Sequence, residues 1–176
     1  MLIRHRRRYL LALAGLICLS QGAADCSRAG GQVRYQLGYA EVAGKPAVYA
    51  PLCPDDEVRG VRVYAAPDPD KGGNFTLLWQ AETPRVDAAR KGLVVLGDDS
   101  QFETVKLAPP ASFPRRLSVS VDTVSGAGPS ENREHSADLP DYPAGTPLAE
   151  MTFETAGGSR SAEQVRRFVE DQHPCG

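Results

Sequence analysis

The stretch LSVSVD, residues 117–122, alternates apolar and polar side chains without interruption. In an extended chain, Leu117, Val119 and Val121 would share one face, and the two serines and the aspartate would share the other. A period of two is what a β-strand needs when one face of its sheet is buried and the other is in water. The stretch therefore predicts a half-buried strand.

More strands are predicted on both sides of this one. Residues 33–39 alternate in the same way, and residues 93–96 are apolar throughout, as a strand covered on both faces would be. Shorter candidates lie at 61–63, 75–79, 102–107 and 151–153. Short strands separated by Gly, Pro and Asp turns, without helices between them, predict a mainly β fold. The specific expectation is a single antiparallel β-sandwich of immunoglobulin-like kind.

Trp79 is the only tryptophan of the chain, and we expect it to be buried in the core. Phe75 and Leu77 precede it at spacings of two. Strict alternation predicts that both lie on the same side of the strand as Trp79.

Two segments depart from the β pattern. Residues 126–146 are polar and rich in Pro and Gly, which predicts a long loop. Residues 162–172 predict a C-terminal helix, because Ser161 and Gln164 have the spacing of a capping box. Its apolar stripe would consist of Val165, Phe168 and Val169. We expect this stripe to cover an open end of the sandwich.

Residues 1–24 have the three regions of a secretory signal. Arginines come first, ten mostly apolar residues follow, and small residues lead up to Ala24. The apolar run is too short to cross about 30 Å of hydrocarbon comfortably, so we predict a cut between Ala24 and Asp25. Retention of the segment as an anchor is the alternative. Lipid on Cys26 is a further one, although lipoprotein processing prefers a small residue where Asp25 stands.

Removal of residues 1–24 leaves 152 of the 176 residues. We expect a flexible lead-in at 25–32 and one β-sandwich domain at 33–176, a comfortable size for a domain with its own core. The protein would then work outside the cytoplasm, secreted or tethered on the outer side of the membrane. Any membrane association would occur only through the N-terminal segment.

The balance of charge excludes one class of partner. The 20 basic and 22 acidic residues give the full chain a net charge of −2. Residues 1–24 contain four arginines and no acidic residue, so their removal changes the net charge to −6. Nucleic-acid binding requires a concentrated positive patch, and the sequence contains no basic run after the signal. We therefore predict that the protein does not bind nucleic acid.

Three cysteines follow the predicted cut: Cys26, Cys53 and Cys175. Thiols tend to pair in an oxidising compartment, and an odd number leaves one over. We predict a disulfide between Cys53 and Cys175, which would fasten the end of the terminal helix to the sheet. Cys26 would then stay free, lipidated or bound to another chain. The rival pairing is Cys26–Cys53.

Signals for catalysis or metal binding are weak. His135 and His173 show no metal-ligand spacing, and Asp68 and Asp70 lie in a Pro/Gly turn that lacks the later ligands of a calcium loop. No serine lies in a nucleophile-elbow motif, and no glycine-rich phosphate loop is present. We predict no catalytic residue, no metal and no cofactor.

Two functional hypotheses remain. The first is a non-catalytic domain of the cell envelope, or a secreted one, that binds a protein partner or an envelope component through a sheet face or the long loop. The alternative is a small secreted hydrolase with a dispersed site near His135. Strand aromatics could line a carbohydrate or peptide surface, although most are expected to pack in the core: Tyr35, Tyr39, Tyr49, Tyr64 and Trp79.

Overall fold

A computed structural model describes residues 37–68, 70, 72–134 and 139–172. Within them the fold is mainly β, with two largely antiparallel sheets and one short C-terminal helix. The predicted fold class is therefore confirmed at this level.

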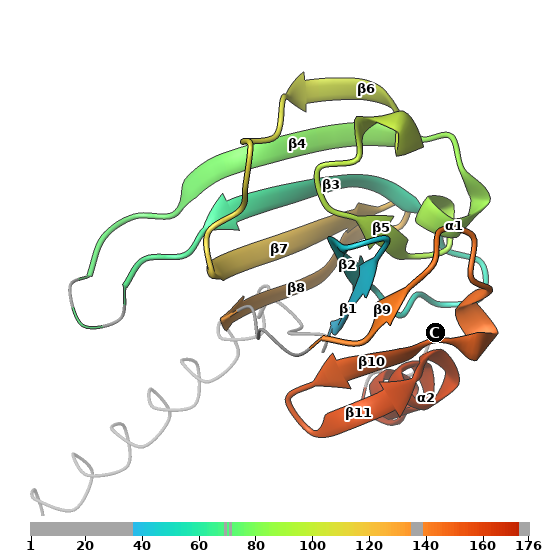
Figure 1. Cartoon of the computed structure of the whole chain (residues 1–176). Helices are drawn as coiled ribbons and strands as arrows, with labels where there is room; N and C mark the ends of the chain where they lie inside the picture. Colours follow the sequence, from blue (N-terminus) through green and yellow to red (C-terminus); the bar gives the residue numbers. More distant parts are fainter. Residues whose placement is uncertain (1–36, 69, 71, 135–138, 173–176) are drawn as a thin grey trace, which may run out of the picture. The chain divides into compact units, whose positions relative to one another are not determined.

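The five-stranded sheet, here called sheet B, has the strand order β6-β4-β3-β7-β8 (Figure 1). The predicted strand at 117–122 is confirmed as the central part of β7. Strand β7 follows β6 in the chain but lies beside β3, on the side of β3 away from β4. The strands are β3 (Val58–Ala65), β4 (Thr76–Pro84), β6 (Phe102–Leu107), β7 (Arg116–Thr123) and β8 (Gly126–Glu134).

Sheet A has the order β11-β10-β1-β2-β5, with β9 paired in parallel to the second half of β1. Residues 33–36 of the predicted first strand lie outside the described residues, and the described strand begins at Gly38. The strands are β1 (Gly38–Val42), β2 (Lys45–Tyr49), β5 (Leu93–Val95), β9 (Asp141–Tyr142), β10 (Thr152–Thr155) and β11 (Gly158–Ser161).

Side chains from both sheets form one buried cluster. Trp79 of β4 is fully buried in it, as predicted. Its ring meets Phe102 edge to face, with centroids 5.6 Å apart, and its indole N–H donates to Asp99 Oδ1 at 2.9 Å. The donor of the tryptophan is thus satisfied although the ring is buried. Other members come from β2, β3, β5 and β7: Val48, Val61, Val63, Val94, Val119 and Val121.

The prediction for Phe75 and Leu77 is wrong because β4 contains a β-bulge. Val63 of β3 lies opposite Trp79, and the next residue, Tyr64, lies opposite Leu77. Leu78 is the extra residue, and it packs against the core in place of Leu77. Strand neighbours face opposite sides, so Leu77 shares the face of Tyr64 and not that of Trp79. Phe75 lies before the strand and is 49 % exposed.

The predicted C-terminal helix is confirmed as α2 (Ala162–Gln172). Its capping box is formed: the amide of Ser161 donates to Gln164 Oε1 at 2.9 Å, and the amide of Gln164 donates to Ser161 Oγ at 3.3 Å. On its exposed side, Arg166 pairs with Glu163 and Glu170, one turn away in each direction.

The expected position of α2 over an open end is wrong. A second buried cluster joins Ala162 and Val165 of the helix to the face of sheet A that does not belong to the first cluster. That face carries large apolar side chains, among them Tyr49 and Phe153, whose rings stack at 5.1 Å. A helix that covers this face buries more apolar surface than one at the end of the sheets would.

Strand β5 shows that sheet A is covered on both sides. Val94 and Leu96 belong to the first cluster, whereas Leu93 belongs to the second and Val95 packs against it. The continuous apolar run at 93–96 therefore has the cause that was predicted for it.

The predicted loop at 126–146 is wrong over its first part. Residues 126–134 form β8, which pairs with β7 along its length. Backbone pairing with β7 stabilises the strand, and its polar sequence gave no indication of this pairing. Its Pro129 is compatible with a strand because β8 lies at the edge of sheet B, where one side of the backbone needs no partner. The register also shifts between Ser120 and Asp122, opposite this part of β8.

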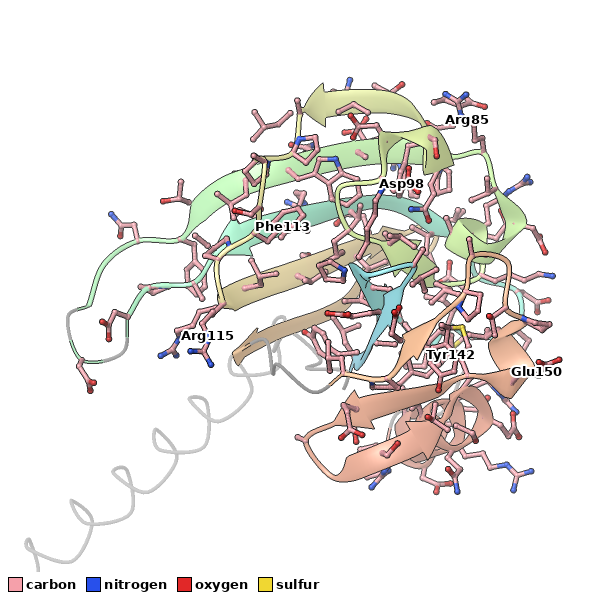
Figure 2. The ribbon with its side chains drawn as sticks, viewed as in Figure 1. Arg85, Asp98, Phe113, Arg115, Tyr142 and Glu150 are labelled. Carbon is pink, nitrogen blue, oxygen red and sulfur yellow. The ribbon has the colours of Figure 1, made fainter. Side chains whose placement is uncertain are left out.

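Short connections complete the described fold. One helical turn, α1 (Asp87–Arg90), leads from sheet B to β5 in sheet A. A 3₁₀ turn at Asp99–Gln101 leads back to β6. The side-chain amide of Gln101 accepts from Val95 N at 3.3 Å and donates to Val95 O at 2.9 Å. Phe113, on the connection from β6 to β7, packs against the first cluster (Figure 2).

Candidate functional site

One sheet face differs from the others in its covering. Sheet A has a hydrophobic cluster on each face, and sheet B contributes one face to the first of these clusters. In the described part of the chain, no hydrophobic cluster covers the opposite face of sheet B, which we call the outer face. The residues of the outer face can be assigned from the strand register.

The outer face carries three rows of residues that run across the strands. Residues opposite each other in a sheet project from the same face, so the register defines each row. The first row is Leu77, Tyr64 and Ser118; the second is Leu107, Gln80, Arg62 and Ser120; the third is Thr104, Glu82, Gly60 and Asp122. Lys106 lies at the β6 bulge beside the second row. Most of these side chains are polar.

An ion pair connects the central strand to its neighbour. Arg62 Nη2 lies 2.5 Å from Asp122 Oδ1, and the two side chains are 37 % and 34 % exposed. The hydrogen bond to Asp122 raises the pKa of the Arg62 guanidinium, against an opposing effect of burial, and Tyr64 adds to the rise. Arg62 is thus fixed as a charged donor at the centre of the face.

A second polar group lies on the other side of Arg62. Gln80 Nε2 donates to Glu82 Oε1 at 3.1 Å, and Lys106 Nζ lies 3.6 Å from Glu82 Oε2. Lys106 and Glu82 remain 52 % and 40 % exposed. Exposed pairs of this kind contribute little to stability, typically under about 1 kcal/mol.

Apolar side chains lie at the margins of the outer face. Leu107, on the edge strand β6, is 40 % exposed. Phe75, just before β4 begins, is 49 % exposed. Leu77 and Tyr64 are partly buried beside each other in the first row. The face therefore combines a polar centre with apolar groups on one row and at the edge.

Several carboxylates in turns and at strand ends have structural roles. Asp98 caps the 3₁₀ turn by accepting from Ser100, and Asp99 accepts from Trp79. Asp56 accepts from both the amide and the hydroxyl of Ser125, at 3.2 and 2.7 Å. The Asp68 carboxylate accepts from the amide of residue 70, as in an Asx turn. These contacts agree with the turn-forming interpretation of the carboxylates.

Most of the site residues predicted from the sequence lie outside the described residues. This holds for the cut at Ala24 and Asp25, for Cys26 and Cys175, and for His135. Cys53 lies between β2 and β3, is partly buried and has an interaction partner. The disulfide, the lipidation site and the hydrolase hypothesis therefore stay predictions.

The aromatic residues divide clearly between core and surface. Tyr39, Tyr49 and Trp79 are buried, whereas Tyr35 lies outside the described residues. Tyr64 is the strand tyrosine of sheet B that projects from the outer face. Alternation with Val61 and Val63 was the sequence signal that Tyr64 faces away from the core. The ion pair beside Tyr64 could not be found in this way, because it depends on the register of three strands.

In the ranges that the structure describes, no helix has the length and apolar character needed to span a membrane. Comparison of the chain with protein-family models, with curated proteins and with solved structures gives no match in any of the three.

Proposed function

We propose that the protein is an exported, non-catalytic domain of the cell envelope, or a secreted domain, that binds a protein partner or an envelope component through the outer face of sheet B. The signal-like residues 1–24 support export. The observation that carries the binding role is that no hydrophobic cluster of the described residues covers this face, which has the Arg62–Asp122 pair at its centre. Rigid elements hold recognition groups more accurately than loops do.

The proposal includes a β-sandwich of immunoglobulin-like kind. The buried cluster shared by both sheets supports the sandwich, because face-to-face sheets bury a common core. The antiparallel pairing of short strands in two sheets supports the immunoglobulin-like comparison. In such an architecture the surface of one sheet can vary for binding while the core maintains the fold.

The test is capture from the envelope fraction with the tagged full chain. A partner that binds saturably and stoichiometrically should be lost when Leu107 is replaced by Glu, because this charge would enter the outer face at its 40 % exposed edge. Val124→Glu is the matched control: Val124 is 69 % exposed in the β7–β8 turn and not in the three rows. Both variants should keep the wild-type melting temperature within a few degrees.

Two results would refute the proposal. One is a partner that both variants retain equally, which would place binding elsewhere on the molecule. The other is the absence of any saturable ligand for wild-type protein in envelope fractions, whether protein or glycan.

A further inference from the structure

In the described residues, two cations of the outer face have carboxylate partners. Arg62 is matched by Asp122 and Lys106 by Glu82, each within 4 Å. A face with matched charges attracts neither a polyanion nor a polycation strongly, because its field falls off quickly with distance. The complementary ligand is therefore one without net charge.

The position of the polar groups argues against a protein as the ligand. The centre of a protein–protein interface is normally apolar and depleted of charged residues, and the rim is polar. The outer face has the reverse arrangement. Arg62 and Asp122 lie on the inner strands β3 and β7, whereas Leu107 lies on the edge strand and Phe75 outside the sheet. A protein partner would have to desolvate the central ion pair. The free-energy penalty of this desolvation exceeds the electrostatic gain unless every buried polar group finds a hydrogen-bond partner.

The functional groups of the face suit vicinal hydroxyls. The side chains of Arg62, Asp122, Gln80 and Glu82 offer planar donors and acceptors that can bind two neighbouring hydroxyl groups at once. The ring of Tyr64 beside Leu77 offers an apolar surface next to these groups. A pyranose ring presents the same combination, with hydroxyls around its edge and C–H groups on its faces.

The size of the face fits a polymer better than a small molecule. From β6 to β7 the second and third rows cross four strands, which at a spacing of about 4.8 Å extend over roughly 14 Å. Small ligands are normally enclosed in concave sites, whereas a sheet face supports an extended chain along its surface. We propose that the outer face binds a neutral polysaccharide chain, with Tyr64 as its stacking platform; this inference rests on the proposed binding function of the same face.

The experiment is native electrophoresis of the full chain through gels that contain dissolved polysaccharide. The neutral probes are hydroxyethyl cellulose, galactomannan and dextran, and alginate is the anionic comparison. At least one neutral polymer should slow the wild-type protein relative to a non-binding reference. Tyr64→Ala should weaken this binding about tenfold, as expected for the loss of one aromatic contact.

Two further variants control for folding. Gln80→Ala removes polar contacts without removing a ring, and it should weaken binding severalfold. Tyr142→Ala removes a partly buried tyrosine from sheet A and should leave binding unchanged (Figure 2). Near-ultraviolet circular dichroism checks that each variant keeps its packed core.

The inference is overturned if no neutral polymer slows the wild-type protein, if alginate slows it more than the neutral probes, or if folded Tyr64→Ala and Tyr142→Ala behave alike. A protein partner captured through the outer face, without any polysaccharide binding, would overturn this inference and leave the proposed function standing. Failure of both experiments would refute both.

Discussion

Gly92 shows at the scale of one residue why a particular amino acid is required. Its φ is +98°, in the region that side chains with a Cβ rarely adopt. A Cβ on this residue would lie 2.1 Å from the carbonyl oxygen of Ala50, which is far inside van der Waals contact. The Gly92 carbonyl in turn accepts from the amide of Ala50 at 2.9 Å. This contact joins the start of β5 to the end of β2.

Gly92→Ala should therefore destabilise the protein by more than the conformational cost of placing alanine at a positive φ. Gly44→Ala is the matched control, because Gly44 has a φ of +70° with open space around its Cβ position. The control should cost about 1–2 kcal/mol of unfolding free energy. Gly92→Ala should cost at least about 2 kcal/mol more, because the backbone of β2 has to move. Urea unfolding measures both, and equal losses would contradict the steric argument.

Asp56 is a residue whose charge stabilises a turn. Partial burial opposes ionisation, but the hydrogen bonds that the carboxylate accepts from Ser125, Thr123 and the amide of Glu57 outweigh it, so the pKa of Asp56 is lowered. A carboxyl with a lowered folded pKa stabilises fully above its ordinary value of about 4. The stabilisation is lost as the pH falls through the folded pKa.

Asp56→Asn should lower stability by roughly 1 kcal/mol at pH 7, the usual size of such hydrogen bonds. The difference from wild type should shrink as the pH falls from about 4, because the wild-type carboxyl then becomes protonated as well. Asp55→Asn, at the exposed neighbouring position, should have little effect at either pH. Denaturant melts of the three proteins at pH 7 and in acid provide the comparison. If the stability difference between Asp56→Asn and wild type grew in acid, the predicted direction of the pKa shift of Asp56 would be wrong.

At the scale of the element, α2 depends on the reciprocal contacts of Ser161 and Gln164 at its start. Ser161→Ala should cost about 1 kcal/mol, a typical value for a lost N-cap. Ser159→Ala, two residues earlier on an exposed position of β11, serves as the control and should be close to neutral. The melting temperature reports on both variants. A neutral Ser161→Ala would show that packing against sheet A is sufficient for this helix.

Elements could be predicted where the local pattern and the tertiary environment agree. In β7 the alternation matches one buried and one open face, and in α2 the capping box and apolar stripe match the helix. The bulge at Leu78 could not be predicted, since apolar residues at 75, 77 and 79 fit an unbroken strand equally well. Strand β8 was missed because its hydrogen bonds go to β7, a partner that its own Gly- and Pro-containing sequence does not indicate.

At the scale of the whole molecule, sequence reasoning led to the proposal of a binding sheet face without indicating which face, and the binding role stays a proposal. Which sheet face is covered depends on α2, whose residues pack on sheet A. The apolar stripe of a helix predicts that it packs, but not which of several apolar surfaces it packs against. The pairing of Arg62 with Asp122 spans 60 residues and depends on the β3–β7 register.

The predicted Cys53–Cys175 disulfide would link the segment after β2 to the chain end that follows α2. Peptide mapping without reducing agent should recover these two cysteines in one linked peptide from exported protein. Cys175→Ser should lower stability by up to about 4.7 kcal/mol, the chain-entropy value for a loop of about 100 residues. A Cys26–Cys53 peptide, or three free thiols, would show that the pairing is wrong.

Export makes a separate prediction for the whole chain. Protein recovered outside the cytoplasm should begin at Asp25, and intact-mass measurement will show it. A mass that includes residues 1–24 would instead identify a retained anchor. Added mass on Cys26 consistent with lipid would identify a lipoprotein.

The side chain of Gln101 has a consequence for how the molecule behaves among its own copies. Strand β5 is the last strand of sheet A, so the backbone of Val95 would otherwise offer a donor and an acceptor to any extended chain. Gln101 occupies both groups from within the molecule, as one residue of an added strand would. A strand of a second copy could pair with β5 at this position only after displacing the Gln101 side-chain amide from the backbone of Val95. Crowding alone therefore does not favour fibre formation from this edge, and folded protein can accumulate without nucleating it.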